Sequence, residues 1–227
     1  MTDQSLENLI RQLNSGNQEN IILKQLTDNV YLAVVWDLPA GALTTLGIEY
    51  PHRFYFVKNE TDQFVAAVFD MIQDLHWFTL PEYRGKGYLS GALRQTILDH
   101  LICCHQRSEQ RITISKELLD SVNFEASGRL AGSVGFVKQG ENEFEVIHLY
   151  KPANSIEFEE PDYKGLSEEQ LQVIQQKINV AANIIARVNT ELELAYGQEP
   201  EVKSVEKLSK KVYSEMFRIE DFWDKKQ

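Results

Sequence analysis

The spacing of apolar residues predicts a short helix near the start of the chain, followed by strands. Four apolar residues share one helical face, and the polar cluster 14–17 after them is typical of a helix end. They are Leu6, Leu9, Ile10 and Leu13. Residues 21–26 have the composition of a strand. Residues 30–36 form an apolar run that fits a helix or a strand, because periodicity alone does not separate the two in so short a segment.

Two further apolar runs, 53–57 and 64–69, flank the polar segment 58–63, whose residues suit a hairpin loop. We therefore expect two antiparallel strands. A third strand, residues 75–80, runs into Pro81 and a glycine-containing loop. After that loop, apolar residues recur at helical spacing. They are Leu89, Leu93, Ile97, Leu98, Leu101 and Ile102.

The next elements alternate between strand and helix. Residues 112–114 predict a strand, residues 127–133 a short helix, and residues 143–150 a final strand before Pro152. The order of elements therefore indicates a mixed α/β (α+β) domain, in which a mostly antiparallel sheet is flanked by helices.

Beyond Pro152 the acidic stretch 157–162 is typical of a linker, and strand-like composition disappears. We place a boundary near residue 155. The expected organisation is one domain over residues 1–155 and a helical extension over residues 160–227.

The extension carries two apolar stripes with alternating spacings of three and four residues, separated by turn formers at 197–200. The first stripe is Leu171, Ile174, Ile178, Ala181, Ile185, Val188 and Leu192. The second is Val205, Leu208, Val212, Met216, Ile219 and Trp223. Together they predict a helical hairpin. The stripes can pair with each other, dock on the first domain or meet a second subunit, so a homodimer through these helices is one hypothesis.

Composition narrows the class of protein. The chain has 227 residues, of which 43% are hydrophobic and 25% charged, as in soluble globular proteins. No apolar run approaches the ~18 to 20 residues of a membrane span, and the N-terminus lacks the pattern of a secretory signal. The net charge of -11 disfavours binding to nucleic acid or anionic membrane. The two cysteines, Cys103 and Cys104, are adjacent and unsuited to a disulfide, so we expect a cytoplasmic protein.

The most informative segment is 80–89, Leu-Pro-Glu-Tyr-Arg-Gly-Lys-Gly-Tyr-Leu, between a predicted strand and a predicted helix. The first N–H groups of a helix lack intrahelical partners, and glycines let the backbone approach a ligand closely. Arg84 and Lys86 add cationic side chains suited to phosphate. This pattern is typical of an anion-binding loop, although a solvated turn into a helix has similar composition.

Residues 81–87, Pro-Glu-Tyr-Arg-Gly-Lys-Gly, resemble the acetyl-CoA loop of the GNAT N-acetyltransferase superfamily. Arg84 and Gly87 match the family pattern, whereas Leu89 stands where the family has Gly or Ala. The Leu89 side chain either crowds the pyrophosphate or points into the interface between helix and sheet. Residues 127–136 resemble the late helix of the family and its Gly-Phe turn, so the resemblance covers about residues 20 to 151.

The resemblance implies a GNAT-like acyl-CoA N-acyltransferase fold and acetyl-CoA as co-substrate. A primary amine of a small molecule or protein would attack the thioester directly, with no covalent enzyme intermediate. The residues implied in cofactor binding are Phe78, Thr79, Leu80, Arg84, Gly85, Lys86, Gly87, Tyr88, Leu89, Ser90 and Ser127. The acceptor and the acyl chain length are not fixed by the resemblance.

Three residues are candidates for acid–base chemistry. Asp74 and His76 lie nearest the usual base position of the family, and a histidine titrates near neutral pH. The family often has a tyrosine as acid at the position of Ala131. With alanine at this position, water, Tyr83 or Tyr88 would protonate the thiolate. Alternatively, the domain would bind acyl-CoA with little turnover and recruit a partner through its helical tail.

A cluster of histidines and cysteines at the end of the predicted helix has spacings found in metal sites. It comprises His100, Cys103, Cys104 and His105. No second pair of ligands occurs elsewhere in the chain, so we expect packing rather than a metal here.

Overall fold

The computed structural model describes residues 1–37, 51–115, 117, 119, 121–138, 146–152 and 165–226. The chain divides into two compact units, residues 1–160 and residues 161–227. The predicted linker 157–162 lies outside the described residues, as does the predicted start of a strand at 143–145.

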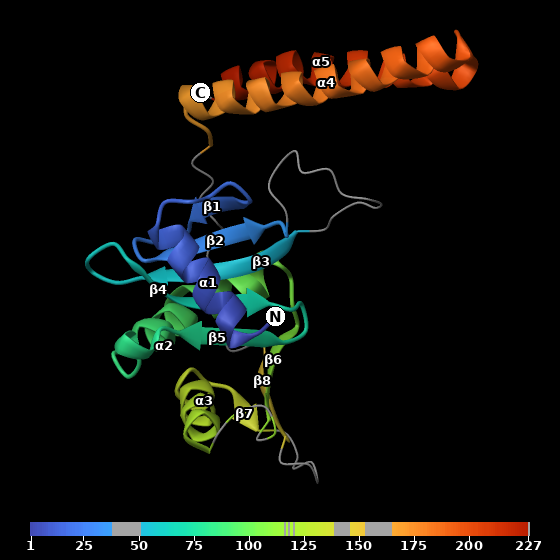
Figure 1. Ribbon diagram of the computed structural model, residues 1–227. Helices are drawn as coiled ribbons and strands as arrows, with labels where there is room; N and C mark the ends of the chain where they lie inside the picture. The colour runs from blue at the N-terminus through green and yellow to red at the C-terminus, as the bar shows by residue number, and fades with distance from the viewer. Residues whose placement is uncertain are drawn as a thin grey trace. The chain divides into compact units, whose positions relative to one another are not determined.

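Five strands of the first unit form one antiparallel sheet in sequence order (Figure 1). They are β1 (Ile21–Gln25), β2 (Val30–Val35), β3 (His52–Lys58), β4 (Phe64–Asp70) and β5 (Leu75–Thr79). The predicted hairpin of β3 and β4 is confirmed. The undecided run 30–36 contains a strand, because both edges of β2 find partners: Ile21 pairs with Val35, and Val30 pairs with Val57.

Helices cover both faces of this sheet. The helix α1 (Asp3–Asn14) is stabilised at its start by a capping box between Thr2 and Ser5, and it crosses one face (Figure 1). Phe54 and Phe56 of β3 pack on that side, whereas Tyr55 and Val57 face the other core. All four side chains are buried because a strand alternates its side chains between faces and both faces are covered.

The second face is covered by a continuous helical run from residue 88 to residue 104, as predicted. It begins as α2 (Tyr88–Ala92) and continues through wider π-helical turns, Leu93–Ile97 and His100–Cys104. Its apolar residues, including Leu93, Ile97 and Leu101, form the core beneath the sheet.

A smaller sheet completes the first unit. It contains β6 (Glu109–Ser115), β8 (Val146–Pro152) and β7 (Val137–Lys138) in the order β6-β8-β7, with antiparallel pairing. The last strand therefore ends two residues beyond its predicted end at 150.

Before β7 lies α3 (Ser121–Ser133), which starts six residues before the predicted start at 127. The early turns escaped prediction because they carry no amphipathic stripe: Val122 is exposed, and Ala131 is the buried residue of the helix. The α+β fold class with a mostly antiparallel sheet flanked by helices is confirmed.

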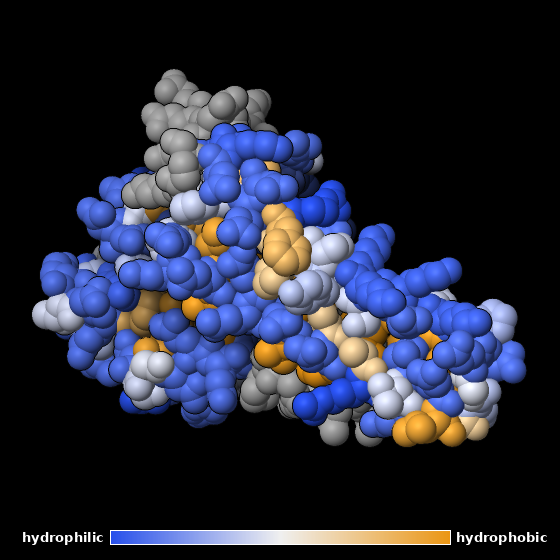
Figure 2. Space-filling view, turned by 90° about the horizontal axis from the view of Figure 1, so that it is seen from above, coloured by the Kyte–Doolittle hydropathy of each residue, from blue (hydrophilic) through white to orange (hydrophobic). Residues whose placement is uncertain are grey.

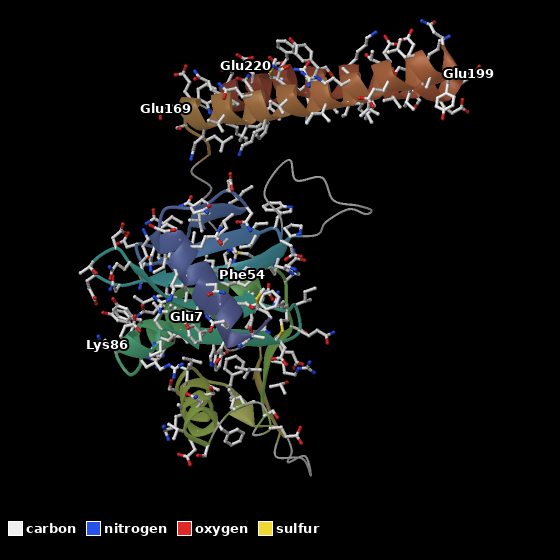
Figure 3. All side chains as sticks on the ribbon, viewed as in Figure 1. Glu7, Phe54, Lys86, Glu169, Glu199 and Glu220 are labelled. Atoms are coloured by element: carbon white, nitrogen blue, oxygen red, sulfur yellow. The ribbon has the colours of Figure 1, made fainter. Side chains whose placement is uncertain are left out.

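The second unit is a hairpin of two helices, α4 (Glu168–Tyr196) and α5 (Pro200–Asp224), as predicted. A capping box of Ser167 and Gln170 begins α4, and Gly197 caps its end. Figure 3 labels Glu169 and Glu199 near the opposite ends of α4.

The predicted contact surface between these two helices is wrong at two positions of α4. Ala181 and Val188 are exposed, and the buried residues are their neighbours Ala182 and Asn189. The hydroxyl of Ser209 on α5 donates to the carbonyl oxygen of Ala182, with a distance of 2.9 Å. The small side chains of Ala182 and Ser209 at this crossing allow close approach of the two backbones.

The same shift occurs on α5, where the predicted contact residue Leu208 is half exposed and Ser209 takes its place. Among the helices that the structure describes, no segment combines the length and the apolar composition needed to span a bilayer.

Candidate active site

A pocket of about 530 Å³ opens where the two sheets of the first unit diverge. The strand β5 is the last strand of the large sheet, and β6 is the first strand of the small one. Residues 75–79 of β5 form one wall, and residues 112–114 of β6 together with α3 form the other. The loop after β5 lines one end. One edge of β5 pairs with β4, and none of the described strands pairs with its second edge, which is therefore suited to a ligand lying in this pocket.

Asp74 ties the two diverging strands together. Its carboxylate Oδ1 accepts hydrogen bonds from the backbone N–H groups of Leu75 and Thr113, both at 2.9 Å. Its other oxygen lies 3.5 Å from Nε of Arg111. The carboxylate of Asp74, a candidate base in the sequence analysis, thus accepts hydrogen bonds from the backbone of β5 and of β6. These bonds suit a structural role at the point where the two strands separate.

The loop between β5 and α2 has the backbone expected of an anion-binding loop. Gly85 and Gly87 have φ angles of 72° and 85°, a region that other residues rarely adopt. Gly87 directly precedes the first turn of α2, whose N–H groups have no intrahelical partners. A Cβ atom on Gly85 would meet no atom within 4 Å, so the space beside this backbone is open to a ligand.

Arg84 lines the pocket and spans from β5 to α3. Its Nε donates to the carbonyl oxygen of Thr79 at 3.1 Å, and its Nη1 donates to Oδ1 of Asn123 at 3.3 Å. The guanidinium also lies 5.7 Å from the ring centre of Phe78. These contacts hold a positive charge at the loop end of the pocket.

Lys86 is placed differently. Its Nζ lies 4.9 Å from the ring centre of Tyr83, and its side chain extends from the outer edge of the loop (Figure 3). Lys86 is absent from the pocket lining, whereas Arg84, Gly85 and Gly87 belong to it. Of the two predicted cations, Arg84 is therefore the one that faces the pocket.

Tyr88 is fastened to the loop between β3 and β4. Its hydroxyl donates to Oε2 of Glu60 at 2.6 Å. This hydrogen bond raises the pKa of Tyr88 above its usual range and lowers the pKa of Glu60. The hydroxyl of Tyr83 likewise donates to Gln63 at 2.9 Å. The two tyrosines thus anchor the glycine loop to the neighbouring hairpin, a role that the sequence did not indicate.

The two departures from the family pattern have structural explanations. Leu89 is 7% exposed and packs in the core between helix and sheet, which answers the question left open by the sequence. Ala131 is also fully buried in that core. Ser127, Leu130 and Ser133 of α3 line the pocket, so position 131 supplies no side chain to it.

His76 contacts an acidic residue that sequence analysis missed. Its Nε2 lies 2.7 Å from Oδ1 of Asp3, and both residues line the pocket. Asp3 is the first residue of α1, and the packing of α1 on the sheet brings it to β5. No local sequence signal relates these two residues.

The predicted cluster at the end of the helical run is a packed polar site. The Nδ1 of His100 lies 2.9 Å from the hydroxyl of Tyr55. Burial lowers the pKa of His100 to about 4, so this imidazole is neutral at neutral pH. Burial also raises the pKa of both Cys103 and Cys104. Within the described ranges, no three His, Cys, Asp or Glu side chains are grouped to hold a metal ion.

Comparison with solved structures finds several that are similar to this chain, and two of them are described here. No protein-family model and no curated protein matches the chain. One structure is a chimera of the spermidine N-acetyltransferase SpeG from Vibrio cholerae and hSSAT. It has 17% identity and a TM-score of 0.36, over 46% of this chain and 68% of that chain.

The other structure is of mutant forms of the spermidine/spermine N-acetyltransferase SpeG from Vibrio cholerae. It has 14% identity and a TM-score of 0.38, over 68% of this chain and 92% of that chain. Both structures are of proteins named as N-acetyltransferases. At these scores and identities, the acceptors named for them remain properties of those proteins.

Proposed function

We propose that the first unit is an acetyl-CoA-dependent N-acetyltransferase, which transfers an acetyl group to a primary amine of a small molecule or protein by direct attack. The observation that carries this proposal is the pocket between the diverging strands β5 and β6, which ends at the loop of Arg84, Gly85 and Gly87. This arrangement offers an extended strand edge beside a binding site for phosphate.

The residues of the pocket fit acetyl-CoA along its length. The N–H groups at the start of α2 and the guanidinium of Arg84 suit the phosphates. The free edge of β5 at residues 77–79 suits the amides of the pantetheine arm. A strand rises about 3.3 Å per residue, so three residues from Thr79 back to His76 span roughly 10 Å. The thioester, which supplies the activated acetyl group, would then lie near His76.

His76 is the residue that we assign as general base. An attacking amine must be neutral, and an imidazole within the pocket is suited to accept its proton. The carboxylate of Asp3 would hold the ring in position and stabilise it when protonated. Asp74 is less suited to this role because its carboxylate already accepts two backbone N–H groups. The hydrogen bond of Tyr88 to Glu60 supports an anchoring role for its hydroxyl.

Calorimetric titration of acetyl-CoA into the protein and into the Gly87→Glu variant tests the cofactor site. The substitution places a negative side chain where φ is 85° and where phosphate would bind, so affinity should be lost. Gly197→Glu is a matched control, since Gly197 has a φ of 78° and belongs to the other unit. A folded parent that binds no acetyl-CoA, or equal affinity in Gly87→Glu, would overturn the proposal.

A second candidate function is an acyl-CoA-binding module with little turnover, whose helical tail recruits a partner. It is favoured by one observation: Ala131 supplies no acidic group to the pocket, because it is buried in the core. Release of free CoA thiol in the presence of primary amines distinguishes the two functions. An acetyltransferase releases thiol with at least one amine, whereas the binding module binds acetyl-CoA without release.

A further inference from the structure

The helical hairpin places large apolar side chains on its outside. Four branched residues form a row along α4 and are between 44% and 57% exposed. This outer row consists of Val173, Val180, Ile184 and Val188. By contrast, the surface between α4 and α5 buries Ala182 and Asn189, and Oδ1 of Asn189 has no hydrogen-bond partner there. Apolar residues are visible on the exterior of the hairpin in the space-filling view (Figure 2).

Three of the four residues of the outer row, Val180, Ile184 and Val188, are placed symmetrically in sequence about Ile184. Val180 and Val188 lie four residues before and after Ile184, which is about one helical turn in each direction. Lys177 and Glu191 lie seven residues before and after it, about two turns away, and they fall on the same face. About Ile184, the apolar Val180 is therefore the mirror position of the apolar Val188, and the positive Lys177 is the mirror position of the negative Glu191.

We propose that the outer row of α4 is the interface with a second copy of this chain, in which the two α4 helices run antiparallel about a two-fold axis at Ile184. A two-fold interface joins each surface to the same surface of the partner, so mirror-related positions meet. Val180 then meets the partner's Val188, and Ile184 meets the partner's Ile184. Lys177 meets the partner's Glu191 at each end of the contact.

The charges of Lys177 and Glu191 favour a second copy of the chain as the partner and an antiparallel orientation of its α4 helix. In a parallel arrangement Lys177 would face the partner's Lys177, and Glu191 would face the partner's Glu191, which is repulsive. Among the described residues, neither Lys177 nor Glu191 has an ion-pair partner within the chain. A partner of different sequence would not require this mirror relation. The antiparallel second copy satisfies it at Val180, Ile184 and Val188 and at the two flanking charges.

The shape of this face also suits a second helix. A groove of about 420 Å³ runs beside the row and is lined by Val180, Asn183, Ile184, Ala186, Arg187 and Thr190. Side chains of one helix insert into such spaces between side chains of the other in packed helical bundles. Two hairpins joined in this way form a four-helix arrangement that covers the exposed row.

The test is exchange of the mirror-related charges in the full chain, with mass and dissociation constant measured by analytical ultracentrifugation. Lys177→Glu and Glu191→Lys each create two like-charge contacts, so each should weaken the dimer about tenfold. An equimolar mixture of the two variants should restore dimers, because both contacts are then of opposite charge. The double variant should restore them as well.

Two further variants complete this experiment. Ile184→Glu brings two glutamate carboxylates together at the two-fold axis, so this variant should be a monomer. Circular dichroism should show that α4 remains helical in it. Lys211→Glu on α5 is the matched control and should leave the dimer unchanged. A monomeric parent, dimers that persist in Ile184→Glu, or failure of the mixed variants to reassociate would overturn the proposal.

Discussion

The Nε2 atom of His76 lies 2.7 Å from Oδ1 of Asp3, although 73 positions separate the two residues in sequence. The contact exists because α1 packs across the sheet and its first turn lies beside β5. It converts an isolated histidine on a strand into an imidazole with a carboxylate partner at the wall of a pocket.

Replacing His76 by Gln should lower kcat for acetyl transfer by about 100-fold, because general base catalysis contributes that much or more. Asp3→Asn should lower kcat by about tenfold and leave the KM for acetyl-CoA nearly unchanged, because Asp3 acts on the ring of His76. Steady-state kinetics with the best amine acceptor measure both effects. Glu7→Gln on the same helix is the control and should retain activity; equal losses in all three variants would point to disruption of α1 instead.

Arg84 and Lys86 should differ in their effect on cofactor affinity. Arg84→Ala removes a cation that faces the pocket, and we expect the dissociation constant of acetyl-CoA to rise about tenfold. Lys86→Ala removes a cation on the outer rim, and its effect should stay within about twofold. Calorimetry on both variants provides the comparison. A larger loss for Lys86→Ala than for Arg84→Ala would contradict the placement of the phosphates.

Protonation of His100 should destabilise the first unit in acid. Burial lowers its pKa from 6.5 to about 4, so the unfolded chain binds this proton more readily than the folded one. The stabilisation is fully present above pH 6.5 and is lost as the pH falls toward 4. Its size is roughly 1 to 2 kcal/mol once the partial exposure of the ring is allowed for.

Urea unfolding between pH 7 and pH 4, followed in the parent and in His100→Asn, measures this effect. The variant should lose less stability over this interval than the parent does. An identical pH dependence in the parent and His100→Asn would contradict the prediction.

Position 131 should not accept the tyrosine that the family often has there. Ala131 is fully buried, and Ala131→Tyr should destabilise the first unit by about 1 to 3 kcal/mol, because added volume forces the core apart. Leu130→Tyr is the informative comparison, since residue 130 lines the pocket and can present a hydroxyl there. Thermal unfolding and CoA thiol release distinguish the two variants. A stable, more active Ala131→Tyr protein would show that this part of α3 can rotate.

Much of the fold followed from local patterns in the sequence. The helix α1, the hairpin of β3 and β4, the order strand–loop–helix around Gly87 and the two long helices of the tail were all predicted. Each depends on residues that are close together in sequence, because helical and strand periodicities and turn-forming residues act over a few positions. The sequence therefore determined which segments form elements and where the glycine loop lies.

Contacts between distant segments were decided only by the tertiary structure. Pairing on both edges made residues 30–35 a strand, and the packing of α1 joined Asp3 to His76. In the contact between α4 and α5, Ala182 is buried and its identical neighbour Ala181 is exposed, because the side of α4 that faces Ser209 is set by the packing of α5. Such choices depend on the shape and burial of partners far away in the chain, and a local pattern of apolar residues carries no record of those partners.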